Sequence, residues 1–220
     1  GINLINNSLV IFDRFSQENA NMCVFGTSGS GKSYAVKTHA VRELMMGSDI
    51  IIIDPENEYE YLAKAVGGES YKIAVASKDH INPFDLPVIA SDETVGEVFR
   101  GHILNLIGLI KILLGGLSPM EEVTIDQAIT LTYASRNISP ETDNKFESMP
   151  ILEDLVNVLN TMEGGANLAA KLYKYTKGTY GQFLNNPTNI NIRNKFIVFN
   201  INDLEEELRP IAMYILLNYV

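Results

Sequence analysis

The sequence is short of three things, and each shortage excludes a class of protein. Its one cysteine, Cys23, cannot form a disulfide within the chain, which excludes a disulfide scaffold and fits a reducing, cytoplasmic setting. Its longest apolar run, residues 103–116, is shorter than a membrane span and carries Asn105 and Lys111, so we expect a buried or interface helix there. With 17 Lys and Arg against 27 Asp and Glu, the net charge of −10 argues against a surface built mainly for nucleic acid.

One motif is complete. Residues 26–33 read GTSGSGKS, which matches the phosphate-binding pattern G-x-x-x-x-G-K-[ST] at every specified position. An apolar run precedes the motif and a helical pattern follows it, which is the context that such a loop requires. The expected nucleotide-binding residues are therefore Gly26, Thr27, Ser28, Gly29, Ser30, Gly31, Lys32 and Ser33.

The chemistry of a nucleoside triphosphate explains this choice of residues. Glycine allows positive φ and a close approach of the backbone, so that successive N–H groups can point at one anion. A helix that begins near Lys32 adds the positive end of its dipole. We expect Lys32 to contact the β- and γ-phosphates as a catalytic group, and the Ser33 hydroxyl to bind the Mg²⁺ that bridges them.

The first 90 residues follow an α/β pattern. Alternation over residues 1–15 is typical of short edge strands, and residues 21–25 predict a strand that buries Cys23. A helix over 32–46 and a strand over 49–54 complete a strand–loop–helix–strand unit, and the isoleucines of this last strand predict burial on both faces of a parallel sheet. A helix over 56–65 and a strand from residue 71 follow.

The next section of the chain has a different pattern. Residues 91–185 show helical periodicity throughout, with helices expected over 92–114, 118–135, 150–162 and 166–175. Ser118, Pro119 and Glu121 form a complete helix start, and the glycine pairs at 115–116 and 164–165 predict helix ends. A strand over 195–201 and a helix from about residue 204 return to α/β in residues 186–220. The fold class is thus an α/β sheet interrupted by an all-α subdomain.

A second acidic position follows the isoleucine strand, in the sequence IIIIDPE. Either Asp54 is the Mg²⁺-holding aspartate, or this is the neighbouring strand and the true one lies later in the sequence; we favour the second interpretation. In that case Glu56 is expected near the γ-phosphate as a catalytic residue, because open α/β sheets bind ligands outside the carboxyl ends of their strands. The alternative is a first-turn glutamate that only complements a helix dipole.

Several segments, taken together and in order, resemble one family. They are the phosphate loop with its flanks, IIIDPENEYEYL, INPFD, GGLSPMEEVTIDQAITLTYASRNI, MPILEDLVNVL, YTKGTYGQFLNNPTNI and FIVFNINDLEEELRPIAMYILLNYV. This series is similar to the C-terminal ATPase domain of the large VirB/TraC-class ATPase of type IV secretion and conjugation systems. The resemblance implies a RecA-like fold with an all-α subdomain and Mg²⁺-dependent ATP hydrolysis that energises pilus assembly or substrate transfer.

The resemblance also implies partners. Other subunits of the same ATPase would form a ring, expected to be a hexamer, with an arginine reaching across each boundary; Arg100, Arg136, Arg193 and Arg209 are the candidates. Inner-membrane secretion-channel proteins and a coupling ATPase would be further partners, at the cytoplasmic face of the cell membrane. The family has an Asp-Glu strand after the helix that reaches Val220, so we expect this sequence to be a piece of a longer protein and part of its catalytic site to be missing.

Other functions share some of these features. A DNA-translocating motor of the HerA/FtsK type, or a conjugative coupling protein, has the same loop and an acidic strand end; nucleic acid is therefore a possible partner that the acidic charge does not favour. LLGGLSP from Leu113 is only loosely similar to the signature of transporter ATPases. A scaffold that binds nucleotide without hydrolysis is a further alternative. His39 and His102 are expected to be ordinary packing or surface residues.

Overall fold

The computed structural model describes residues 5–8, 13–87, 94–140 and 148–219. Its elements are, in order, α1 (Lys32–Met45), β1 (Ile50–Asp54), α2 (Glu60–Ala65), β2 (Glu69–Lys72), α3 (Val95–Leu114), α4 (Pro119–Ala134), α5 (Leu152–Thr161), α6 (Gly165–Thr176), α7 (Gly181–Leu184), β3 (Phe196–Asn200) and α8 (Arg209–Tyr219). Of the segment expected to form short strands, residues 1–4 and 9–12 lie outside the described residues, and residues 5–8 and 13–15 form no strand.

The described strands form one parallel sheet in the order β1-β3-β2. Strand β3 is the central strand, although it comes last in the sequence, and Phe196, Ile197, Val198 and Phe199 are all buried. These side chains alternate: Phe196 and Val198 pack with α1 and α2, while Ile197 and Phe199 belong to the larger cluster with α3 to α8. Parallel pairing through β3 thus joins an early part of the chain to a late one, as the α/β pattern predicts.

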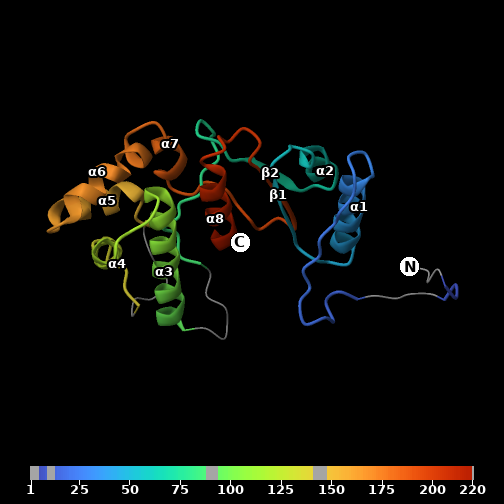
Figure 1. The fold of residues 1–220 in the computed structure, drawn as a ribbon, viewed down its shortest axis with the longest axis horizontal. Coiled ribbons are helices and arrows are strands. Elements are labelled where there is room, and N and C mark those ends of the chain that lie inside the picture. The colour runs from blue at the N-terminus through green and yellow to red at the C-terminus, as the bar shows by residue number, and fades with distance from the viewer. Residues whose placement is uncertain (1–4, 9–12, 88–93, 141–147, 220) are drawn as a thin grey trace.

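Five helices, α3 to α7, lie between β2 and β3 in sequence and occupy one end of the molecule, with the sheet in the middle and α1 at the other end (Figure 1). Within residues 94–140 and 148–185, the structure describes no strand. The expected helices are present with small shifts of their ends, and α7 was not expected. The division into 1–90, 91–185 and 186–220 as domains stays a prediction.

The helix starts and ends in this block follow the expected local chemistry. The Ser118 hydroxyl accepts a hydrogen bond from the Glu121 N–H, and the Glu121 carboxylate accepts one from the Ser118 N–H. Pro119 is the first helical residue. Gly115 ends α3 with φ of 72° and Gly164 precedes α6 with φ of 78°. Both glycine pairs therefore lie at helix ends, as predicted.

Two predictions for the start of the sheet were wrong. Residues 21–25 form no strand, and Cys23 is exposed rather than buried, because no strand of the described residues borders this segment and so no ladder can form. Strand β1 is not buried on both faces either. In the described sheet β1 is an edge strand, whose one partner is β3. The side chain of Ile51 in this strand is 39% exposed.

The remaining differences concern element ends. Residues 56–59 form a turn before α2 rather than its first turn, and α8 begins at Arg209, after turns over 202–208. Strand β2 ends at Lys72, where the chain turns: the Ser77 hydroxyl donates to the Lys72 carbonyl, and Asp79 accepts from the Lys72 N–H. None of the helices in the part of the chain that the structure describes is long and apolar enough to cross a membrane.

Candidate nucleotide-binding site

The glycines of residues 26–33 have the backbone that a phosphate loop needs. Gly29 and Gly31 have φ of 76° and 87°, in the region where a side chain would be strained. At Gly26 a Cβ atom would lie 2.4 Å from Ser30 Oγ, so a larger residue there would require the Ser30 side chain to move. Gly31 is also the residue that precedes α1, and the first turn of this helix therefore opens directly from the loop.

The loop presents several backbone donors without a partner. Ser30 N–H donates to the Thr27 carbonyl at 3.2 Å. The N–H groups of Gly29, Gly31, Lys32 and Ser33 have no hydrogen-bond partner among the described residues. Unpaired donors at the start of a helix bind anions, so this arrangement fits a phosphate group.

Lys32 lies folded over the loop. Its Nζ atom donates to the carbonyls of Gly26 and Thr27, at 2.9 Å each. These are contacts of a cation with neutral acceptors on an exposed segment, which a phosphate can replace at little cost. Within the described residues, the Lys32 ammonium has no carboxylate partner that would hold it away from a ligand.

Asp54 and Glu56, at and just after the end of β1, lie in different environments. Asp54 is only 2% exposed, and its two oxygens accept the N–H groups of Glu56 and Tyr59 at 3.2 and 2.9 Å. Its carboxylate thus shapes the turn that leads into α2. Glu56 is exposed, one residue before Asn57, whose φ is 55°. Asn200 at the end of β3 donates to Asn57 Oδ1 at 2.5 Å, which fixes this turn at the carboxyl edge of the sheet.

Helix α1 contacts the same turn. Lys37 Nζ lies 3.8 Å from a carboxylate oxygen of Glu58 and 5.0 Å from the centroid of the Tyr59 ring. Burial, then the nearby charges of Glu58 and Asp54, raise the pKa of Tyr59. The loop's helix and the acidic turn are therefore neighbours. The described residues hold no group of three or more His, Cys, Asp or Glu side chains that could bind a metal on their own.

The four candidate arginines differ in whether other residues of the same chain bind their guanidinium groups. Arg136 binds both carboxylate oxygens of Asp154, at 3.0 and 3.1 Å, and Arg209 donates to the carbonyls of Leu204 and Asn202. Arg100 and Arg193 are exposed. Of the two histidines considered from the sequence, His102 is a core residue whose Nε2 lies 2.8 Å from the Tyr133 hydroxyl, and His39 lies on α1 beside Glu43. Both were expected to be packing or surface residues.

The family model of the TraG P-loop domain matches residues 5–220. The chain belongs to the TraG P-loop domain family. Its structure is also similar to that of VirB4 of Thermoanaerobacter pseudethanolicus, with a TM-score of 0.81 and 24% sequence identity over 97% of this chain. The chain spans 60% of the length of that protein. No curated protein matches it.

These comparisons confirm the α/β P-loop fold and the resemblance to VirB/TraC-class proteins. The chain is thus a P-loop domain of this family, and residues 26–33 match the phosphate-binding pattern; that these residues bind the nucleotide stays a prediction. Two sequence signals identified the family: the complete loop motif and the order of segments that follows. The packing of Asp54 into the turn before α2 had no signal in the sequence, because an aspartate at a strand end can as easily face a ligand.

Proposed function

We propose that this chain is an ATP-binding and ATP-hydrolysing motor domain that energises a type IV secretion or conjugation machine. The observation that carries the proposal is the open phosphate loop, with its four unpaired N–H groups and a lysine held only by neutral carbonyls, in a chain of the TraG P-loop family. The structural similarity to VirB4 supports the same class of motor. In our proposal, ATP hydrolysis by this domain energises either pilus assembly or substrate transfer.

The loop fits MgATP by its shape and its donors. The unpaired N–H groups and Lys32 would hold the β- and γ-phosphates, and Ser33, at the first turn of α1, would contribute its hydroxyl to the Mg²⁺. Bound Mg²⁺ supplies charge neutralisation between the phosphates. What the chain itself does is to orient the phosphates by a rigid backbone and to place one positive charge on them.

Glu56 is proposed as a catalytic residue that acts beside the γ-phosphate. Three observations support it: Glu56 is exposed, it follows a strand at the carboxyl edge of the sheet, and Lys37 of α1 contacts the same turn. Asp54, whose oxygens are both occupied by backbone N–H groups, is proposed to be structural. Glu56→Gln is expected to lower the hydrolysis rate with little change in nucleotide affinity. An unchanged rate would leave Glu56 without a catalytic role, as an exposed residue of the turn before α2.

The proposed working form is a ring of identical subunits, expected to be a hexamer, at the cytoplasmic face of the cell membrane. Its further partners would be the inner-membrane channel proteins and a coupling ATPase. Among the arginine candidates, Arg100 and Arg193 are favoured over Arg136 and Arg209, because the latter two are held by their own chain. An arginine that reaches a neighbour's nucleotide must be free of such contacts.

The direct test is phosphate release from ATP by the wild-type protein and by Lys32→Ala. Loss of the charge aimed at the β- and γ-oxygens is expected to abolish release, whereas Lys195→Ala, which removes an exposed lysine just before β3 at the amino end of the sheet, is expected to retain it. Equal rates for wild type and Lys32→Ala would overturn the proposal. Adding double-stranded DNA distinguishes the alternative: strong stimulation would favour a DNA-translocating motor of the HerA/FtsK type or a coupling protein.

A further inference from the structure

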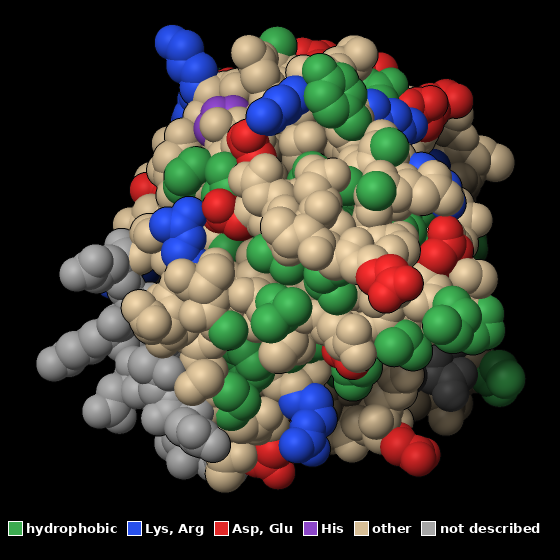
Figure 2. Space-filling model, turned by 90° about the vertical axis from the view of Figure 1, so that its left-hand side faces the viewer, with side chains coloured by type: hydrophobic (Ala, Val, Ile, Leu, Met, Phe, Trp, Pro, Cys, Tyr) green, Lys and Arg blue, Asp and Glu red, His purple; other side chains and the backbone are tan. Residues whose placement is uncertain are grey.

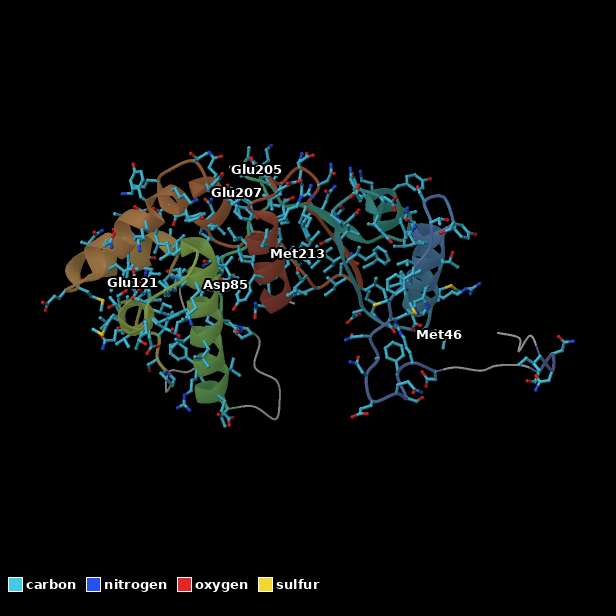
Figure 3. The ribbon with its side chains drawn as sticks, in the orientation of Figure 1. Met46, Asp85, Glu121, Glu205, Glu207 and Met213 are labelled. Carbon is cyan, nitrogen blue, oxygen red and sulfur yellow. The ribbon has the colours of Figure 1, made fainter. Side chains whose placement is uncertain are left out.

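An open pocket with a cavity volume of about 30 Å³ lies where residues 81–85 meet α3 and α8. Leu106 and Leu109 of α3 and Ile215 of α8 form apolar walls, and two exposed asparagines, Asn105 and Asn218, stand at its mouth. None of its lining residues belongs to the phosphate loop or to the acidic turn. Asp85, which also lines the pocket, is labelled beside α3 in Figure 3. The pocket is therefore a second concave site, separate from the nucleotide site.

The loop that forms the floor of the pocket is held rigidly. Asn82 is 2% exposed; its Nδ2 donates to Asp85 Oδ1 at 3.1 Å and to the Pro150 carbonyl at 2.8 Å, and its Oδ1 accepts the Phe84 N–H. The Asn82 N–H donates to Thr188 Oγ1, and Thr188 in turn hydrogen-bonds to the Asp85 carboxylate. Neutral donors thus fix Asp85 in place without neutralising it.

The opposite wall is formed by a close approach of α8 to α3. Tyr214 donates its hydroxyl hydrogen to the Asn105 carbonyl at 3.0 Å, and a Cβ atom at Gly108 would lie 2.2 Å from that hydroxyl oxygen. Asn218, one turn further along α8, donates to the Tyr214 carbonyl. These contacts fix the spacing of α3 and α8 beside the pocket.

The pocket has a negative charge without a positive one. Asp85 forms no ion pair with any described residue, and no Lys or Arg is among the lining residues. His102, also in the wall, is neutral near pH 7, since burial lowers its pKa to about 4. Burial raises the pKa of the Asp85 carboxyl, because a partly desolvated anion lacks a counter-charge. A cation bound here would provide that charge.

The shape and lining select the kind of cation. Apolar walls fit an alkyl stem, and Tyr219 adds an aromatic ring beside the carboxylate. A guanidinium is planar, more weakly hydrated than an ammonium, binds carboxylates through two N–H groups and stacks on aromatic rings. We propose that this pocket binds an alkylguanidinium group, the chemistry of an arginine side chain, with the guanidinium at Asp85 and the stem against Leu106 and Ile215.

The proposal does not depend on ATP binding, and a titration followed by NMR tests it on the protein without nucleotide. The probe is n-butylguanidinium, and n-butylurea is its neutral counterpart of the same shape. Because hydrogen bonds between charged groups are the stronger ones, we expect n-butylurea to bind at least about tenfold more weakly, and Asp85→Asn to weaken n-butylguanidinium by a similar factor. Asp126→Asn, on the exposed face of α4, removes the same charge elsewhere and is the matched control.

A second variant decides the case if Asp85→Asn does not fold. Asn218→Arg places a guanidinium at the mouth of the pocket and is expected to lower probe affinity at least about tenfold by filling the site from the same chain, while Asn218→Gln leaves it unchanged. Equal binding of the guanidinium and the urea, or binding that no pocket variant changes, would overturn the proposal. Nα-acetyl-arginine methylamide identifies the source: binding indicates an arginine side chain of a protein, and its failure beside a bound n-butylguanidinium indicates a small free cation.

Discussion

The two sides of strand β3 differ greatly in how much they bury. On one side, Phe196 and Val198 form a small cluster in which Ala63 is the only other fully buried residue, and α1 has no buried residue at all. On the other side, Ile197 and Phe199 join a continuous core through α3 to α8. The stable part of the molecule is thus the helical side. The phosphate loop is carried on the sparsely packed side, directly before α1.

The outer surfaces of the helical side are of mixed charge. Acidic and basic side chains are interspersed over the end of the molecule that α4, α5 and α6 form (Figure 2). Several are paired between helices: Lys171 with Glu121, and Lys111 with Glu122. Exposed pairs of this kind contribute little to stability, so the comparison between the two sides is a comparison of buried apolar surface.

The largest expected effect comes from a substitution on the side of β3 that packs against α3 to α8. Phe199→Ala removes a fully buried ring from the main cluster and is expected to lower the free energy of unfolding by about 3–5 kcal/mol. Phe25→Ala removes a phenyl ring from a position that is 89% exposed, just before the phosphate loop. This substitution is expected to change the free energy of unfolding by less than about 0.5 kcal/mol. Urea unfolding of both variants measures this difference. Similar losses would show that the described packing does not carry the stability.

A pH titration gives the next largest effect. Burial lowers the pKa of His102 to about 4, so on acidification from pH 7 to pH 5 the unfolded chain gains a proton on this imidazole that the folded chain does not. Stability is therefore expected to fall by about 2 kcal/mol over this range, from a reference histidine pKa of about 6.5. Urea unfolding at the two pH values measures it. His102→Gln should remove most of this fall, and His39→Gln on α1 should not; an equal fall in all three proteins would contradict the assignment.

A matched pair of glycine substitutions gives the smallest effect. At Gly165, where α6 starts, a Cβ atom would lie 2.1 Å from the Leu159 carbonyl oxygen, so Gly165→Ala must open the turn between α5 and α6 and is expected to cost at least about 1 kcal/mol. At Gly101, within α3, nothing lies within 4 Å, and Gly101→Ala is expected to stabilise by up to about 1 kcal/mol because alanine favours helix. Thermal unfolding compares them, and a stabilising Gly165→Ala would refute the close packing.

The local parts of this structure could be predicted because their causes are local. The phosphate loop depends on the spacing of its glycines and lysine, and the start of α4 depends on Ser118, Pro119 and Glu121, all within a few residues. The helices α3 to α6, within residues 95–176, follow from their own apolar periodicity.

The errors came from contacts between distant segments. Whether residues 21–25 pair, and whether β1 is an edge strand, depends on which strand lies beside each one, and the sequence pattern holds no such information. An apolar run such as residues 22–25 favours a strand, but a strand needs a partner for its N–H and C=O groups. The role of Asp54 was open for a different, local reason: its partners are the N–H groups of Glu56 and Tyr59, in a turn that the sequence pattern placed in a helix.

The central claim is that residues 26–33 bind the phosphates of a nucleotide on a part of the molecule that contributes little to folding. Calorimetric titration of MgATP-γS into wild type and Lys32→Ala, with urea unfolding of both proteins without nucleotide, tests it most directly. The account predicts at least about a tenfold loss of affinity in Lys32→Ala, from a lost charge-assisted contact, with an unfolding free energy within about 0.5 kcal/mol of wild type. Equal affinity of the two proteins would contradict it.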